Sequence, residues 1–233
     1  MNVSYLVTCS TETGTLKRLL EKVFSHLGND ELVILQDESL WNNDRRKYLA
    51  DITELNKVPS KIVNLPIFVH PLNRDYGTHK NFGIEKCKGD WIFQIDGDEL
   101  PPESLIGENL HELIESNSNV EAYAVPRINA WLGLTPEHAK QWGWGLDESA
   151  TYKRLRAAWP DYQWRIFKNT PSIRFRKRLH ERIDGFKAYA ILPAEEEWAL
   201  YHDKTIETQI TTNLRYNEWF TSAENEGVSK PIS

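Results

Sequence analysis

The segment Asp90-Trp-Ile-Phe-Gln-Ile-Asp-Gly-Asp-Glu99 is an apolar run that stops abruptly at three carboxylates, Asp96, Asp98 and Glu99. A buried strand that ends in clustered acids places oxygen ligands at the carboxyl end of a sheet, where open α/β sheets bind their ligands. Mg²⁺ and Mn²⁺ prefer such ligands. If the chain stays extended here, Asp96 and Asp98 share one face and can address one ion. A strand running into an acidic turn is the plainer alternative, because Asp and Gly are ordinary turn residues.

The composition indicates a globular chain of 233 residues, 40% hydrophobic and 27% charged. No apolar run reaches the about 18 residues of a transmembrane helix, and the N-terminus lacks the basic region of a signal peptide. Cys9 and Cys87 are too few and too far apart for a disulfide scaffold or a zinc site, so a reducing, cytoplasmic location is expected. The net charge of −6 argues against gripping nucleic acid through overall charge.

Strands and helices alternate through the first half of the chain. The expected strands are 3–9, 31–36, 61–70, 91–95 and 121–129, and the expected helices are 16–27, 45–55, 78–88 and 101 to about 116. This order predicts a mostly parallel sheet covered by helices on both faces. After residue 129 we expect a Gly- and Trp-rich loop to about residue 160, strands 162–167 and 173–183, a helix 207–220 and a frayed end.

Polar groups follow three of the expected strands. They are Thr8-Cys9-Ser10, Asp37-Glu38-Ser39 and Asp96-Gly97-Asp98. In a parallel sheet these strand ends meet at one edge, which predicts a single site there. Asp37 and Glu38 are also suited to cap the helix that follows.

Further motifs follow in a fixed order. They are His79-Lys80-Asn81-Phe82-Gly83-Ile84, Gly89-Asp90-Trp91-Ile92, Gln163-Trp-Arg-Ile-Phe167, His180-Glu181 and His202. Together with the three strand ends, they resemble glycosyltransferase family 2 of the GT-A fold over residues 3–220, and most resemble bacterial transferases that decorate lipopolysaccharide cores. The resemblance implies an α/β fold whose mostly parallel central sheet has helices on both faces, with a smaller C-terminal β region on the acceptor side.

The resemblance also implies one domain, 1–220, followed by a frayed tail, 221–233. Residues 1–100 would form the nucleotide-sugar half and residues 101–220 the acceptor and catalytic half. The implied activity is metal-dependent transfer of a sugar from a nucleoside-diphosphate sugar, expected to be a UDP-sugar, to an acceptor hydroxyl with inversion. Mn²⁺ or Mg²⁺ would offset the charge of the departing diphosphate.

Residue roles follow from the same resemblance. Asp98 would ligate the metal, Asp96 would contact the ribose or the metal shell, and His202 would be a third ligand or a diphosphate contact. Asp37 would read the base, and Thr8, Lys80 and Asn81 would line the nucleotide pocket.

Inversion needs a base that deprotonates the acceptor hydroxyl. The family usually places a Glu-Asp pair there, and His180-Glu181 takes its position in this chain. Glu181 is therefore the expected base and Asp161 the second candidate. The cationic segment around Lys177 could stabilise the diphosphate or receive an anionic acceptor.

The acceptor stays open between a glycan, a lipid-linked sugar, a protein side chain and a hydroxymethylated base of DNA. Trp142 and Trp144 could stack on the acceptor or anchor their loop. A non-catalytic sugar- or nucleic-acid-binding module is an alternative. A haloacid-dehalogenase-type phosphatase is disfavoured because its Asp-x-Asp ends the first strand, not about the fourth. A nucleotidyltransferase would need a Gly-rich loop that residues 10–14 do not supply.

Overall fold

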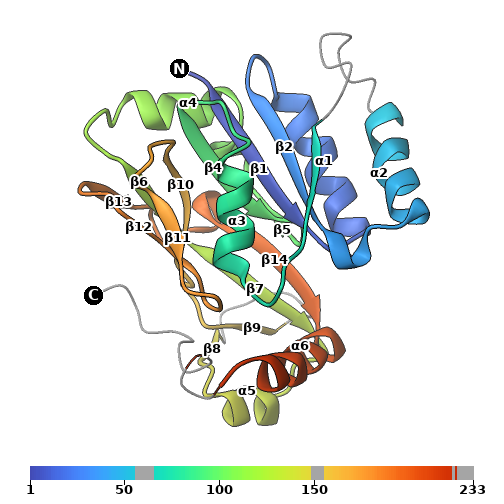
Figure 1. Cartoon of the computed structure of the whole chain (residues 1–233). Coiled ribbons are helices and arrows are strands. Elements are labelled where there is room, and N and C mark those ends of the chain that lie inside the picture. Colours follow the sequence, from blue (N-terminus) through green and yellow to red (C-terminus); the bar gives the residue numbers. More distant parts are fainter. Residues whose placement is uncertain (56–65, 148–154, 222–223, 225–233) are drawn as a thin grey trace.

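The computed structural model describes residues 1–55, 66–147, 155–221 and 224. Its centre is a seven-stranded sheet with the order β13-β6-β10-β4-β1-β2-β3 (Figure 1). The strands are β1 (Val3–Cys9), β2 (Glu31–Asp37), β3 (Ile67–His70), β4 (Trp91–Asp96), β6 (Ala122–Val125), β10 (Gln163–Lys168) and β13 (Tyr189–Ile191).

Strands β1, β2, β3 and β4 run parallel to one another. Within this sheet only β10 runs antiparallel to its neighbours, which are β4 and β6. Thr8 pairs in register with Asp96, so the ends of β1 and β4 are level with each other. The predicted fold class, a mostly parallel α/β sheet, is confirmed.

Helices cover both faces of the central sheet. They are α1 (Gly14–His26), α2 (Asn43–Leu55) and α4 (Glu108–Glu115) on one face and α3 (Tyr76–Ile84) on the other. Alternate side chains of β1 point to opposite faces, so Tyr5 and Val7 pack with α1 while Leu6 packs on the α3 side. The hairpin of β11 (Arg174–Arg176) and β12 (Arg182–Asp184) completes the α3 side.

A second sheet has the order β5-β14-β7-β9-β8. Its strands are β5 (Glu99–Leu100), β7 (Arg127–Leu132), β8 (Leu146–Asp147), β9 (Leu155–Ala157) and β14 (Leu200–Thr205). Helices α5 (Pro136–Trp142) and α6 (Ile206–Trp219) lie at its end (Figure 1). Because β14 pairs with both β5 and β7, His202 stands level with Glu99 and Asn129. Three 3₁₀ turns, Glu38–Leu40, Glu103–Leu105 and Glu196–Trp198, complete the elements.

Several predicted elements are divided by local backbone chemistry. The strand expected over 121–129 is two strands, because Pro126 lacks the N–H that would continue the ladder. The strand expected over 173–183 is a hairpin whose tip has positive φ at Lys177 and His180. The helix expected from residue 101 is preceded by a 3₁₀ turn and begins only after Gly107, whose φ is +57°.

Six helices and strands were not predicted, namely β5, α5, β8, β9, β13 and β14. Residues 61–65 of the expected third strand and nearly all of the expected tail lie outside the described residues. In the part of the chain that is described, no helix is long and apolar enough to cross a membrane.

Gly77 at the start of α3 generates a stability prediction, because a Cβ there would collide with the carbonyl oxygen of Lys177 at the hairpin tip. Gly77→Ala should therefore lower the free energy of unfolding by about 2 kcal/mol, as overpacking does. Gly14→Ala is the matched control at the start of α1, since its Cβ would meet nothing within 4 Å, and it should change stability by less than about 1 kcal/mol. Urea unfolding measures both, and equal effects would contradict the packing of the hairpin on α3.

Candidate active site

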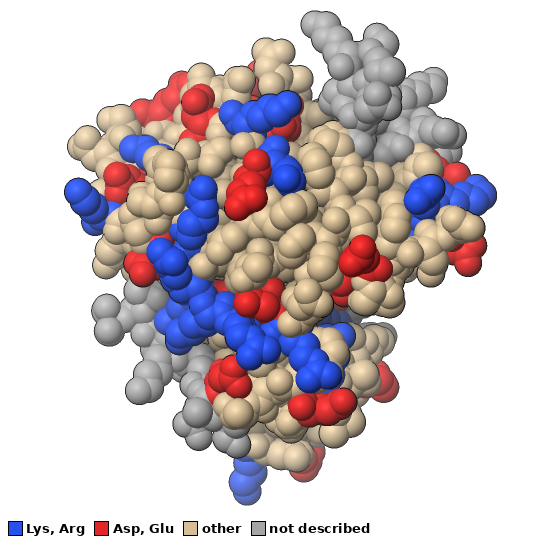
Figure 2. Space-filling model, viewed as in Figure 1, with Lys and Arg blue, Asp and Glu red and all other residues tan. Residues whose placement is uncertain are grey.

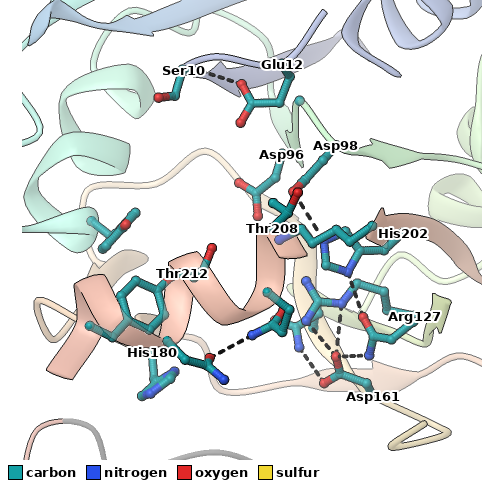
Figure 3. Close-up of a pocket in the computed structure, with 18 of the residues that line it drawn as sticks. Ser10, Glu12, Asp96, Asp98, Arg127, Asp161, His180, His202, Thr208 and Thr212 are labelled. Atoms are coloured by element: carbon teal, nitrogen blue, oxygen red, sulfur yellow. Dashed lines mark hydrogen bonds and ion pairs between the residues drawn. The ribbon is translucent and has the colours of Figure 1, made fainter. Parts of the chain in front are cut away.

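A cavity of about 2420 Å³ opens at the carboxyl ends of β1, β2 and β4, beside the second sheet (Figure 3). It exceeds the roughly 300–1,000 Å³ of a typical small-ligand site, so it has room for two substrates. Eight of the nine predicted site residues line it, namely Thr8, Asp37, Lys80, Asp96, Asp98, Asp161, Glu181 and His202.

Asp96 is fully engaged by protein groups. Its Oδ1 accepts from Thr8 Oγ1 at 2.7 Å and Lys80 Nζ at 2.9 Å, and its Oδ2 accepts from Arg165 Nη2 at 2.6 Å. Burial alone would raise the pKa of Asp96, but Arg165 and Lys80 outweigh it and hold the pKa well below its usual range. Asp96 is therefore an ionised carboxylate with neither oxygen left without a partner.

Asp98 faces His202 and Lys204. Its Oδ2 lies 3.3 Å from His202 Nε2 and 3.0 Å from Lys204 Nζ. Burial would raise the pKa of Asp98, but Lys204 and His202 outweigh it and lower the pKa. These two residues alternate along β14, so both side chains reach the cavity from the same strand face.

Asn129 fixes the orientation of the His202 ring. Its Nδ2 donates to Asp161 Oδ2 at 2.7 Å, so its Oδ1 must accept, and His202 Nδ1 lies 2.7 Å from that oxygen. Burial and the Lys204 ammonium lower the pKa of His202, which favours the neutral ring. With the proton on Nδ1, the Nε2 lone pair points at the Asp98 carboxylate.

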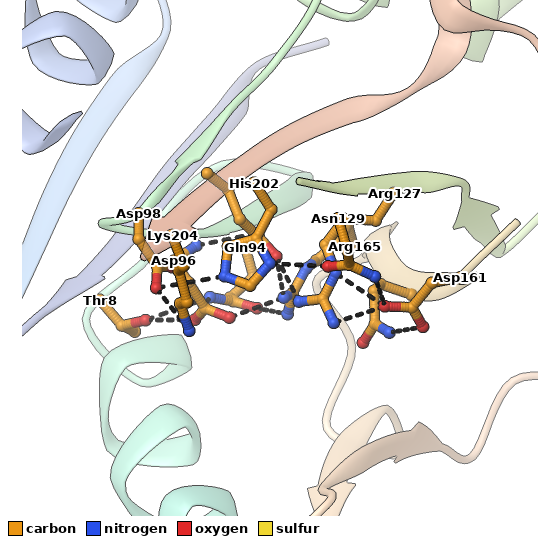
Figure 4. A network of polar contacts seen from close by, with 12 residues as sticks. Thr8, Gln94, Asp96, Asp98, Arg127, Asn129, Asp161, Arg165, His202 and Lys204 are labelled. Carbon is orange, nitrogen blue, oxygen red and sulfur yellow. Dashed lines mark hydrogen bonds and ion pairs between the residues drawn. The ribbon is translucent and has the colours of Figure 1, made fainter. Parts of the chain in front are cut away.

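A buried ionic network lies beside this group (Figure 4). Arg165 Nη2 bridges Asp96 and Glu99 at 2.6 Å each, and Arg127 bridges Glu99 at 2.9 Å and Asp161 at 2.6 Å. Glu99 is completely buried. Glu99, the third acid of this segment, thus points into the protein, where it binds two arginines, and it does not line the cavity.

Asp161 is also held on both oxygens. Its Oδ2 accepts from Arg127 and Asn129, and its Oδ1 accepts from Gln163 Nε2 at 2.7 Å. Burial would raise the pKa of Asp161, but the Arg127 guanidinium and these hydrogen bonds lower it. A carboxylate of this kind is a weak proton acceptor.

Glu181 has a simpler environment at the cavity wall. Lys80 Nζ lies 2.7 Å from its Oε1 and is its one ion-pair partner within the described residues. The same ammonium contacts Asp96, so the buried Lys80 links the acidic strand end to the hairpin that carries Glu181.

Three further predicted residues have different surroundings. Asp37 lines the cavity and also caps the 3₁₀ turn, accepting from Ser39 N and Leu72 N. Thr8 donates to Asp96 as described above. Asn81 does not line the cavity, because its amide exchanges two hydrogen bonds with the backbone of Phe175, at 2.9 and 3.0 Å, and holds β11 on α3.

The tryptophans of the Gly/Trp-rich segment pack on one another. Trp144 stacks on Trp131 with ring centroids 4.4 Å apart and lies 4.8 Å from Trp142. They pack against Leu134 and Ile206 in a small apolar cluster. Trp142 and Trp144 thus anchor α5 to the second sheet while also lining the cavity.

Basic side chains gather in a band across the face that Figure 2 shows. Three arginines lie on aromatic rings at the end of α6, Arg74 and Arg215 over Trp219 and Arg178 over Phe220. Arg178 also meets Glu224 at 3.6 Å in an exposed pair. We call Arg74, Arg178 and Arg215 the arginine cluster; Arg215 and Trp219 border the cavity.

Sequence reasoning missed the residues that organise the acids, which are Gln94, Arg127, Asn129, Arg165 and Lys204. Gln94 gave a signal, since it is polar inside an apolar run and lies two residues before Asp96, on the same face. Arg165 lies in the Gln163–Phe167 motif, which did not indicate its partners. Arg127, Asn129 and Lys204 come from strands scattered along the chain and gave no signal. Among the residues described, no group of three or more His, Cys, Asp or Glu side chains is placed to hold a metal ion.

One protein-family model matches this chain over most of its length. The model of glycosyl transferase family 2 matches residues 4–189. No curated protein matches significantly.

Solved structures show distant likeness. A mannosyltransferase from Pyrobaculum calidifontis in complex with GDP-Man and Mn²⁺ is 15% identical, over 54% of this chain and 35% of that one, with a TM-score of 0.42. S. aureus TarS is 14% identical, over 82% and 37%, with a TM-score of 0.48. TarS 1–349 in complex with UDP-GlcNAc is 13% identical, over 85% and 60%, with a TM-score of 0.42. This chain thus spans less than two thirds of each.

Because the family match extends over most of its length, from the first strand to β13, the chain belongs to glycosyltransferase family 2.

Proposed function

We propose that this glycosyltransferase moves a sugar from a nucleoside-diphosphate sugar, specifically a UDP-sugar, to an acceptor hydroxyl with inversion and with the help of Mn²⁺ or Mg²⁺. In this proposal residues 1–100 carry most donor contacts, and residues 101–220 supply the base and the acceptor side. A cytoplasmic location stays a prediction, consistent with two buried cysteines that are free thiols.

The observation that carries the proposal is the pair formed by Asp98 Oδ2 and His202 Nε2, two acceptors that face each other at 3.3 Å. Two lone pairs in this arrangement need positive charge beside them. The Lys204 ammonium, 3.0 Å from Asp98 Oδ2, supplies it in this structure, and a divalent cation would supply it when bound. Cis ligands of an octahedral ion lie roughly 3 Å apart, given bonds of about 2.1 Å. The hydrogen bond from His202 Nδ1 to Asn129 is the outer-shell support that metal-ligating histidines have.

The donor set therefore fits a divalent cation through Asp98 and His202, with Asp96 as a charged neighbour and not a ligand. A bound Mn²⁺ or Mg²⁺ would stabilise the charge that develops on the departing diphosphate. A site with two protein ligands keeps positions open for phosphate oxygens and water.

The net charge of the ion pairs around Asp96 and Asp98 also favours binding of a cation. These ion pairs include five carboxylates, Asp96, Asp98, Glu99, Asp161 and Glu181, against four cations, Lys80, Arg127, Arg165 and Lys204. With His202 neutral, the sum is −5 + 4 = −1. A diphosphate entering this site meets net negative charge, which an additional cation would offset.

We assign the role of general base to Glu181. It lines the cavity, and Lys80, which also lines the cavity, contacts its Oε1 at 2.7 Å and holds it in place. Asp161 is better suited to positioning, because it holds the Asn129 amide that in turn fixes the His202 ring.

The arginine cluster favours an acceptor that carries negative groups. Stacking on Trp219 and Phe220 limits the motion of the guanidinium planes and leaves their edges able to bind phosphate or carboxylate. A phosphorylated glycan fits this chemistry. A hydroxymethylated base in DNA is the second candidate acceptor, since the same cluster could contact its phosphates.

Removing the Asp98 carboxylate tests the metal-dependent reaction. Asp98→Asn should cut transfer at least about a hundredfold, since the metal contributes several kcal/mol to catalysis. It should also abolish the Mn²⁺-dependent rise in melting temperature that UDP produces in a thermal-shift assay. Asp51→Asn, an exposed acid paired with Lys47, is the control and should behave as wild type. Undiminished activity of the wild type in excess EDTA would refute metal dependence.

Two isosteric variants separate the candidate bases. Glu181→Gln should lower kcat by about 10² or more while the donor still binds. Asp161→Asn should mainly lower the free energy of unfolding, by about 1–3 kcal/mol, because the Arg127 guanidinium loses one of its two charged partners and keeps only Glu99. Steady-state kinetics and urea unfolding of both variants show which residue is the base. A normal kcat in Glu181→Gln with a large loss in folded Asp161→Asn would transfer the role to Asp161.

Charge removal at the arginine cluster tests the acceptor class. The double variant Arg74→Gln/Arg215→Gln should bind fluorescein-labelled polyphosphate about tenfold more weakly in an anisotropy titration, because it loses two guanidinium groups that can form charge-assisted contacts. UDP binding should not change. Lys86→Gln removes a cation that lies on Phe82 elsewhere and is the control. Equal polyphosphate binding by all three proteins would remove the basis for an anionic acceptor.

A further inference from the structure

Lys204 contacts the same Asp98 carboxylate that would bind the metal ion, so the ammonium and the metal would compete for it. Its Nζ is 3.0 Å from Asp98 Oδ2, the same oxygen that faces His202 Nε2. Asp98 is its one ion-pair partner within the ranges that the structure describes. The Lys204 side chain is 21% exposed, so it lies at the cavity wall and not in the core.

The ammonium opposes metal binding in this position. It partly neutralises the carboxylate that would be a metal ligand, and it repels a divalent cation a few ångströms away. Lys204 compensates the Asp98 carboxylate in this structure, and it does so on the same oxygen that faces His202 Nε2, where a metal would bind. A metal bound to this oxygen would displace the ammonium, which would then need another anionic partner.

A diphosphate supplies such a partner. Lysine is a compact charge on a flexible four-carbon stem, so its Nζ can move to a nearby phosphate oxygen without moving the backbone of β14. That movement would release Asp98 Oδ2. The cavity beside Lys204 is the space in which the proposed donor diphosphate would lie.

We propose that Lys204 couples metal binding to donor binding, because it occupies Asp98 when no nucleotide is bound and leaves it for the diphosphate when the donor enters. This inference rests on the proposed function. The free protein then binds Mn²⁺ weakly, and UDP and Mn²⁺ each raise the affinity for the other by the same factor. The site would therefore hold a metal mainly when a donor is present.

The test measures Mn²⁺ affinity from the EPR signal of free Mn²⁺, with and without UDP, in wild type, Lys204→Met and Lys204→Arg. For the wild type we expect affinity about a hundredfold higher with UDP than without. Lys204→Met should bind Mn²⁺ alone about tenfold more tightly than the wild type, and UDP should then raise its affinity only about tenfold. Lys204→Arg keeps the positive charge and should keep the weak binding of Mn²⁺ alone.

A fourth protein and a second titration separate the remaining outcomes. Lys86→Met is the control for loss of a lysine elsewhere and should match the wild type. Equal Mn²⁺ affinity of wild type and Lys204→Met, with and without UDP, would overturn the coupling while leaving the metal site intact. A loss of metal-free UDP binding in Lys204→Met with unchanged Mn²⁺ affinity would make Lys204 a diphosphate contact only. No Mn²⁺ binding in any protein would overturn the proposed metal-dependent function together with the coupling.

Discussion

The pairing of carboxylates with cations at the end of β4 is the constraint on which the site depends. A buried carboxylate is strongly destabilising unless a charged or hydrogen-bonding partner compensates it. Arg165 binds Asp96 and Glu99 at the same time, which requires the start of β10 to lie beside the end of its antiparallel neighbour β4. The fold and the chemistry of the site are therefore specified by the same contacts.

The convergence of the strand ends could be predicted from sequence because it follows from a local pattern. Apolar runs separated by helical segments give parallel strands, and Thr8, Asp37 and Asp96 then meet at one edge. The partner cations could not be predicted. Arg127 and Arg165 come from strands whose neighbours are set by long-range pairing, and nothing in the spacing of the two residues indicates that they share Glu99.

The last strand shows a second limit of the sequence pattern. A half-buried strand is recognised by alternating apolar and polar residues. In β14 the cavity-facing His202 and Lys204 are polar, so this alternation is missing from the sequence. Asn81 shows the converse, because a residue expected in the nucleotide pocket is used to fasten a hairpin to a helix. Positions of this kind are decided by tertiary contacts, which a single sequence does not contain.

The most direct test of the account is a crystal structure of the protein grown or soaked with Mn²⁺ and UDP, with manganese identified by its anomalous signal. The account predicts one manganese bonded to Asp98 Oδ2 and His202 Nε2, with Asp96 still held by Arg165. A manganese bound in this cavity without either of those two atoms, or UDP fully ordered there with no manganese beside Asp98, would contradict it.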